Sequence, residues 1–213
     1  MTDIQDFIKL KNHVESALRE GELCRSSIGP DIVTMEGMTG TKTRNFYNNL
    51  LTLSDARYLE IGTWKGSSVC SAMYKNTANV VCIDNFCTFG GPKDELLSNI
   101  DKYRGNNTVR FLESDCFKVD VNSLPKFNIY LFDGEHTYED QYNAIEYYYN
   151  CLDDMFIYMA DDWNYERVRK GTRDAISHLK LNVLYEKEIF TGYNGDASGW
   201  WNGLGIMILS KSK

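Results

Sequence analysis

The stretch Arg57-Tyr-Leu-Glu-Ile-Gly-Thr-Trp-Lys-Gly-Ser-Ser68 decides the fold of this chain. A short apolar run reaches Glu60, glycines follow at positions 62 and 66, and small and apolar residues come next. This order predicts a strand over residues 57–62, a tight turn, and a helix over residues 66–75. A strand, a glycine turn and a helix form the opening unit of nucleotide-binding α/β proteins.

The residues of the turn discriminate between nucleotides. A dinucleotide site needs Gly-x-Gly-x-x-Gly, because the second glycine lets the backbone approach the pyrophosphate. Counted from Gly62, that second position is Trp64 and the last is Ser67. The indole would block a pyrophosphate and Glu60 would repel it, so a nicotinamide dehydrogenase is disfavoured. Glu-x-Gly-x-x-x-Gly suits an adenosine ligand with a positively charged amino-acid tail, namely S-adenosylmethionine; the alternative is an ordinary strand-turn-helix of another α/β protein.

Composition restricts the class of protein. The chain has 213 residues, 43% of them hydrophobic, and a formal net charge of −7, which predicts a single domain. The charge and the lack of a long basic run argue against general nucleic-acid binding. Residues 1–20 are polar and amphipathic without a signal-like apolar segment, and no stretch is long enough to span a bilayer. We therefore expect a cytoplasmic protein.

The cysteines favour the same compartment. None of the six forms a Cys-x-x-Cys pair, and the three histidines are dispersed, so a zinc site is not expected. We expect reduced and mostly buried thiols at Cys24, Cys70, Cys82, Cys87, Cys116 and Cys151.

Hydrophobic periodicity predicts the secondary structure. We expect strands at residues 57–62, 79–84, 108–113, 127–132, 155–161, 183–190 and 203–210. We expect helices at residues 3–20, 42–53, 66–75, 92–104, 138–152 and 165–180, and irregular structure over 21–40. Thr137 and Asp140 have the spacing of a helix cap.

Alternating strands and helices predict a parallel sheet with helices on both faces. The last two strands are joined by a loop too short for a crossover helix, so they should be antiparallel. The fold class expected is therefore α/β: a Rossmann-like, seven-stranded sheet, mostly parallel, with an antiparallel C-terminal hairpin and helices on both faces, an arrangement that resembles the methyltransferase sheet. We expect a helical extension over residues 1–55 and a cofactor-binding core over residues 56–213.

Ligands of open α/β sheets lie beyond the carboxyl ends of the strands. Asp84 and Asn85 end the second strand, and a carboxylate there can accept both ribose hydroxyls. Ser114, Asp115 and Cys116 follow the third strand. Asp115 suits the adenine amino group, with backbone N–H groups of its neighbours beside the ring; a turn aspartate is an equal alternative.

Three carboxylates should converge where the fourth and fifth strands end. Asp133 follows one strand, and Asp161 and Asp162 end the other. Bare carboxylates so close would repel one another, and a hard divalent cation such as Mg²⁺, or else Mn²⁺ or Ca²⁺, would relieve that. The alternative is that Asp133 and Asp162 only cap the neighbouring helices. His136 lies three residues past Asp133, where it is either a general base or a structural histidine.

These motifs together resemble a known family. The first segment resembles motif I of the class I methyltransferases. Asp133-Gly-x-His136-x-Tyr-Glu139 with Asp161-Asp162 resembles the metal-dependent small-molecule O-methyltransferases, typified by macrocin and mycinamicin O-methyltransferases and cephalosporin hydroxylase-type enzymes, and more distantly catechol O-methyltransferase. The likeness covers about residues 36–180. Where these families have a Gly-Gly turn before the fifth strand, this chain has Leu152-Asp-Asp-Met155.

The resemblance implies a set of functional residues. It implies His136 and Asp133 as catalytic residues, a divalent metal on Asp133, Asp161 and Asp162, and a loop at residues 36–39 that closes over the methionine part of S-adenosylmethionine. The cofactor-binding residues expected are Glu36, Gly37, Met38, Thr39, Glu60, Gly62, Thr63, Trp64, Gly66, Ser67, Ser68, Asp84, Asn85, Ser114, Asp115, Cys116, Asp133 and Gly134.

The function expected is S-adenosylmethionine-dependent, metal-assisted O-methylation of a hydroxylated small molecule. The alternatives are a metal-independent N-, C- or carboxyl-methyltransferase, or a non-catalytic protein that binds an adenosine ligand. The amphipathic first helix can pack on a second subunit, giving a homo-oligomer. The loop with Trp200 and Trp201 is either a wall of the substrate pocket or a hairpin loop packed on the sheet edge.

Overall fold

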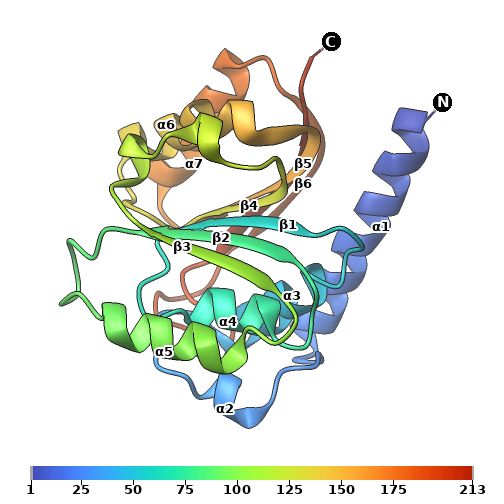
Figure 1. Cartoon of the computed structure of the whole chain (residues 1–213). Helices are drawn as coiled ribbons and strands as arrows, with labels where there is room; N and C mark the ends of the chain where they lie inside the picture. The colour runs from blue at the N-terminus through green and yellow to red at the C-terminus, as the bar shows by residue number, and fades with distance from the viewer. Residues whose placement is uncertain (1, 213) are drawn as a thin grey trace.

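The computed structural model describes residues 2–212. Met1, where the expected helical extension begins, and Lys213, where the expected core ends, lie outside the described residues. One seven-stranded sheet has the strand order β3-β2-β1-β4-β5-β7-β6 and carries helices on both faces (Figure 1). The strands are β1 Arg57–Ile61, β2 Asn79–Asp84, β3 Thr108–Glu113, β4 Phe127–Phe132, β5 Leu152–Asp161, β6 Asn182–Ile189 and β7 Leu204–Ser210.

Strand direction confirms the expected fold class. The five strands β1 to β5 pair in parallel, and β7 pairs antiparallel with both β5 and β6. The connection from β6 to β7 contains no helix, so the chain can only turn back beside the strand it has left. The chain reverses its direction of winding at β1, which lies between β2 and β4.

The helices form two layers. Figure 1 shows α6 Tyr138–Tyr148 and α7 Glu166–His178 over one face, and α3 Thr41–Leu50, α4 Ser67–Met73 and α5 Lys93–Tyr103 over the other. A hydrophobic core lies on each face of the sheet. Alternate residues of a strand contribute to one core or the other, because successive side chains of a strand point to opposite faces. Tyr58 and Leu131 lie in the core under α3 and α4, whereas Leu59 and Tyr130 lie in the core under α6 and α7.

The N-terminal helix α1 Thr2–Glu22 packs against α3 through Val14 and Ala17, which belong to the same core as Phe46. The expected boundary at residues 55 and 56 falls in the turn before β1. The segment expected to be irregular contains one further helical turn, α2 Pro30–Val33, which begins at Pro30 because proline suits a first helical position.

The largest error in a predicted element boundary lies just before β5. The helix expected over residues 138–152 ends at Tyr148, a short 3₁₀ turn follows, and β5 begins at Leu152 rather than at residue 155. Leu152 pairs with Phe127 of β4, and a register shift follows in that pairing. Thr137 caps this helix as expected, since its hydroxyl accepts a hydrogen bond from the Asp140 backbone N–H at 3.0 Å.

All six cysteines are free thiols. Cys70, Cys82 and Cys151 are buried, but Cys24 and Cys87 are exposed, so the expected burial holds for only half of them. Among residues 2–212, no helix combines the length and the apolar character needed to cross a lipid bilayer.

Candidate functional site

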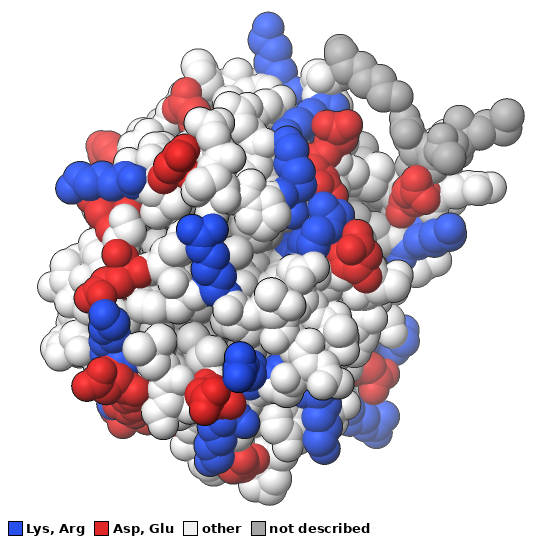
Figure 2. Space-filling model, viewed as in Figure 1, with Lys and Arg blue, Asp and Glu red and all other residues white. Residues whose placement is uncertain are grey.

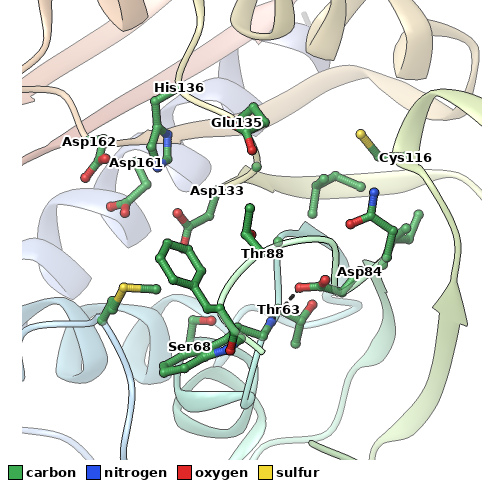
Figure 3. Close-up of a pocket in the computed structure, with 18 of the residues that line it drawn as sticks. Thr63, Ser68, Asp84, Thr88, Cys116, Asp133, Glu135, His136, Asp161 and Asp162 are labelled. Carbon is green, nitrogen blue, oxygen red and sulfur yellow. Dashed lines mark hydrogen bonds and ion pairs between the residues drawn. The ribbon is translucent and has the colours of Figure 1, made fainter. Parts of the chain in front are cut away.

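A cavity of about 450 Å³ opens at the carboxyl ends of β1, β2, β4 and β5. Residues that end or follow these strands, among them Ile61, Asp84, Asp133 and Asp161, line it. Figure 3 shows Asp84 and Cys116 at one end, His136, Asp161 and Asp162 at the other, and Asp133 between them. The cavity lies at the point where the strand order reverses, which is where open α/β sheets bind their ligands.

The glycine turn forms the floor of this cavity. Gly62 has a φ of +87°, and a Cβ atom at this position would lie 1.8 Å from the carbonyl oxygen of Asp133. Only glycine tolerates both the positive φ and this approach of β1 to the end of β4. Gly66, with a φ of +88°, immediately precedes α4.

Asp84 ties the turn to the second strand. Its carboxylate accepts hydrogen bonds from the backbone N–H groups of Trp64 and Phe86, each at 2.7 Å. The indole of Trp64 lines the cavity and donates its N–H to the Phe89 carbonyl oxygen at 3.2 Å. A large ring therefore stands where a dinucleotide fold has its second glycine.

The structure brings most of the expected cofactor-binding residues to one cavity. Those that line it are Met38, Thr39, Gly62, Thr63, Trp64, Ser67, Ser68, Asp84, Asn85, Ser114, Cys116, Asp133 and Gly134.

Five expected residues do not line the cavity. Glu36 forms an ion pair with Lys65 at 2.7 Å. Gly37 lies against Ser67, whose Oγ would be 2.0 Å from an added Cβ. Gly66 faces Leu96.

Asp115 forms a local turn rather than part of the cavity wall. It accepts the backbone N–H of Phe117 at 3.0 Å and pairs with Lys118 at 3.0 Å. Its hydrogen bond with Lys118 is the main factor that lowers its carboxyl pKa. This is the turn aspartate that the sequence left as an alternative.

Glu60, the fifth of these residues, lies beneath the cavity. It is 0% exposed, and its carboxyl group accepts hydrogen bonds from the Tyr58 hydroxyl at 2.6 Å and the Ser68 hydroxyl at 2.7 Å. Burial raises its pKa to about 7, because both hydrogen bonds only partly offset the loss of hydration. Glu60 thus reaches the cavity only through Ser68.

Asp133 and Asp161 form a carboxyl pair. Each accounts for part of the other's altered pKa through a direct side-chain contact. Burial is the largest cause in both, followed by neighbouring carboxylates: it raises the pKa of Asp161 to about 7 and that of Asp133 well above its usual range. Two buried carboxylates in contact favour a shared proton or a bound cation.

Asp162 instead belongs to a second group with His136. The His136 Nε2 lies 2.9 Å from one Asp162 oxygen, and the Asn202 side-chain amide donates to the other at 2.5 Å. Burial opposes protonation of His136, but the hydrogen bond and charge of Asp162 outweigh it and raise the pKa of the imidazole. The His136 Nδ1 is buried and has no hydrogen-bond partner among the described residues.

The capping alternative for these aspartates is wrong. Thr137 caps α6 and Tyr165 precedes α7. Asp162 has a φ of +56°, which is unusual for a residue with a Cβ. Strain of this kind is common where a side chain must point into a functional site.

The expected three-aspartate magnesium site is not seen in the part of the chain that the structure describes. Among residues 2–212, no three His, Cys, Asp or Glu side chains adopt an arrangement that could hold a metal ion. Asp162 is hydrogen-bonded through both oxygens, to His136 and Asn202, whereas Asp133 and Asp161 are neighbouring carboxyl groups that affect each other's pKa. The expectation of a three-aspartate site is corrected to a pair.

Other cavity residues were not identified from the sequence. Cys87, Thr88 and Phe89 come from the loop after β2, and Glu135 precedes His136. Ile61 and Ile83 come from β1 and β2, and Asn202 comes from the loop between β6 and β7, next to Trp201. The paired tryptophans were the one sequence signal for that loop. For them the sequence offered either a pocket wall or packing on the sheet edge, and the two tryptophans divide between these places. Trp201 lines the cavity, while Trp200 is 7% exposed and packs on Phe46 with ring centroids 5.9 Å apart.

The fold is similar to that of several solved methyltransferase structures. An O-methyltransferase from Bacillus cereus in complex with SAH has 14% sequence identity, with a TM-score of 0.57 over 94% of this chain and 91% of that one. The SAH-bound methyltransferase PaMTH1 from Podospora anserina has 14% identity, with a TM-score of 0.60 over 92% of this chain and 88% of that one. TrmN from Thermus thermophilus has 12% identity and a TM-score of 0.60; the match covers 85% of this chain but 52% of that one. At these identities the likeness establishes the fold alone.

Two sequence comparisons add to the likeness of fold. Residues 59–163 match the model of a family described as "Methyltransferase domain". The chain is also 25% identical over 142 residues to uncharacterized protein R132 of Acanthamoeba polyphaga mimivirus; the match covers 63% of this chain and 64% of the relative's length. Residues 59–163 are therefore similar to a methyltransferase domain, and the matched segment contains the glycine turn, Asp84, Asp133 and Asp161.

Proposed function

We propose that this protein transfers the methyl group of S-adenosylmethionine to a hydroxyl oxygen of a small molecule. The observation that carries the proposal is the presence of two distinct ends in one cavity. One end has the glycine turn and Asp84, and the other has His136 held by Asp162 (Figure 3).

The Asp84 end suits the nucleoside. Each oxygen of its carboxylate is already fixed by a backbone N–H group, which orients the remaining lone pairs toward the cavity that Asp84 lines. Two oriented carboxylate oxygens match the two hydroxyls of a ribose. Met38 and Thr39 would cover the methionine part, and Ser114 and Cys116 would flank the adenine.

The His136 end suits proton removal. In its neutral form the imidazole donates its Nε2–H to Asp162 and leaves Nδ1 unprotonated. Because Asp162 raises the pKa of His136, the population of this neutral form increases as the pH rises. As the acceptor oxygen attacks the methyl carbon, the carbon–sulfur bond breaks, S-adenosylhomocysteine leaves, and the hydroxyl proton passes to Nδ1. Alignment of oxygen, methyl carbon and sulfur is what the cavity contributes to the rate.

A divalent cation would fit the carboxyl pair rather than a three-aspartate site. Asp133 and Asp161 are in contact and repel each other when ionised, and no Lys or Arg is among the described residues that line the cavity. When bound, such a cation would lower the pKa of the acceptor hydroxyl.

Calorimetry with S-adenosylmethionine, in excess Mg²⁺ and in excess EDTA, tests the cofactor end directly. We expect binding in both conditions and weaker binding by Asp84→Asn, with Asp55→Asn, an exposed aspartate outside the cavity, as the matched control. Absence of binding by the wild-type protein would contradict the proposal. If Asp84→Asn bound S-adenosylmethionine as tightly as the wild-type protein, the proposed ribose role of Asp84 would be wrong.

A screen with radiolabelled methyl donor tests the reaction and its acceptor. Methylated hydroxyl products that disappear in EDTA would support a metal-assisted reaction. The same products in EDTA would support proton removal by His136 alone. Products methylated only on nitrogen, carbon or carboxylate would contradict O-methylation, and cofactor binding without any turnover would favour a binding protein.

A further inference from the structure

Two segments that lie far apart in the sequence line the cavity, one beside the proposed methionine part of the cofactor and one at the His136 end, which we call the acceptor end. Met38 and Thr39 form part of the cavity rim, and Trp201 and Asn202 form another part. The chain next to each segment is joined by backbone hydrogen bonds: Thr41 N–H to the Ala197 carbonyl at 2.9 Å, and Lys42 N–H to the Gly199 carbonyl at 3.0 Å. The two segments therefore move as one wall.

A single carboxylate from the N-terminal helix holds both segments. Glu22, the last residue of α1, accepts the indole N–H of Trp200 at 2.8 Å with one oxygen and pairs with Lys42 through the other. The Lys42 contact is exposed and contributes little by itself. The indole contact differs, because Trp200 is buried and would otherwise leave its N–H without a partner.

Contacts continue from Trp200 to the proposed base. Trp200 is fixed in the core against Phe46, and the chain then turns at Trp201, which has a φ of +60°. The next residue, Asn202, donates to Asp162, and Asp162 holds His136. The placement of Trp200 thus sets where Trp201 and Asn202 enter the cavity.

We propose that Glu22 is a positioning residue for the acceptor end of the cavity. By fixing Trp200 and Lys42, it holds Trp201 against the acceptor space and Asn202 against the Asp162–His136 pair. It has no contact with the Asp84 end. The term acceptor end rests on the proposed function. The series of contacts from Glu22 to His136 does not depend on that function.

Two substitutions remove the contacts of Glu22 with Trp200 and Lys42 to different extents. Glu22→Gln keeps an oxygen that can accept the indole N–H but loses the charge toward Lys42, whereas Glu22→Ala loses both. Glu15→Gln is the matched control, because Glu15 lies on the same helix and is exposed, and its ion pair at 3.7 Å is with Lys11 of that helix. Thermal unfolding of each variant establishes that it folds.

Hydrogen exchange of the full chain measures the loosening. We expect amide exchange over residues 196–203 to accelerate by about three- to tenfold in Glu22→Ala, less in Glu22→Gln and not in Glu15→Gln, as expected for the loss of one or two hydrogen bonds. Exchange over the glycine turn at residues 62–66 should stay unchanged. The proposal would be overturned if amide exchange over residues 196–203 were as slow in Glu22→Ala as in the wild-type protein, or if exchange became faster throughout the chain.

A spectroscopic signature shows whether the effect reaches the site. In protein with ¹⁵N-labelled histidine, the ring resonances of His136 should shift in Glu22→Ala, while those of His178, on α7, should not. A merely local structural role for Glu22 would leave His136 unmoved, and that result would refute the coupling. Because neither measurement needs turnover, failure to find a methyl acceptor would leave this proposal standing on its own test.

Discussion

At the scale of single residues, His136 shows how a position gains chemistry from its partners. Asp162 determines which nitrogen carries the proton, and burial leaves the other nitrogen without a partner. A histidine with one nitrogen oriented and the other free has the arrangement of a general base.

Replacement of His136 tests this role. We expect His136→Gln to lower the turnover number by about 10²–10⁴-fold, the range typical of a lost general base. Affinity for S-adenosylhomocysteine should stay within about twofold, because His136 and Asp84 lie at opposite ends of the cavity. Initial rates and calorimetry measure both, with the exposed His178→Gln as control; undiminished turnover would exclude His136 as the base.

Arg44 organises the loop over the cavity without entering it. Its guanidinium is buried and donates to three backbone carbonyls, those of Ile32 at 2.7 Å, Met35 at 2.9 Å and Thr39 at 2.9 Å. Burial lowers the pKa of Arg44 to about 10. A planar fork of donors can serve three carbonyls at once, which a lysine cannot.

The conservative variant Arg44→Lys should therefore be damaging. We expect it to reduce the free energy of unfolding by about 2–4 kcal/mol, because buried carbonyls lose charged donors. Chemical denaturation measures the loss, and Arg104→Lys, on an exposed arginine, is the control. A change of less than about 0.5 kcal/mol would show that water replaces the guanidinium at little cost.

At the scale of elements, the turn between β1 and α4 joins three strand ends. Gly62 N–H donates to Ile83 of β2 at 2.9 Å, and Asp133 N–H, just beyond β4, donates to Ile61 of β1 at 2.9 Å. These bonds bring the backbone of β4 so close that position 62 has no room for a side chain.

Gly62→Ala should consequently destabilise the whole sheet. The added methyl group must displace the Asp133 carbonyl, and the backbone must keep a positive φ, so we expect a loss of about 3 kcal/mol or more, or failure to fold. Gly90→Ala is the informative control, because that glycine also has a positive φ of +84° but has nothing within 4 Å of an added Cβ. Equal losses in the two variants would attribute the effect to φ alone, and the predicted steric contribution would be wrong.

At the scale of the whole molecule, charge restricts the acceptor. Five carboxylates line the cavity, namely Asp84, Asp133, Glu135, Asp161 and Asp162, and no Lys or Arg does among the described residues. On the face seen in Figure 2, basic and acidic side chains are interspersed, without an extended basic surface. The charge of the cavity lining leads us to expect that anionic acceptors bind less well than neutral ones.

A charge series of acceptors tests this expectation. Among catechols that differ only in a side-chain amine, methyl or carboxylate group, we expect kcat/KM to be lowest for the carboxylate, by about tenfold or more relative to the neutral compound. The comparison needs low and high salt, because screening should reduce the difference. Preference for the carboxylate at low salt would contradict the electrostatic argument.

Local sequence by itself determined the sheet and its cofactor end. Glycine spacing at residues 62 and 66, apolar runs and strand-ending aspartates are short-range features, so they predicted the mostly parallel sheet, the antiparallel hairpin and the positions of Asp84 and Asp133 at strand ends. The boundary between α6 and β5 was mispredicted because pairing of Leu152 with β4 overrides the local pattern.

Only the tertiary structure decided how the acceptor end is built. Asn202 meets Asp162 across 40 positions of sequence, and Glu22 meets Trp200 across 178. These contacts divide the three aspartates into a carboxyl pair and a histidine partner, which no spacing along the chain encodes. The physical reason is that a side chain's role follows from its hydrogen-bond partners, and folding supplies those partners from distant segments.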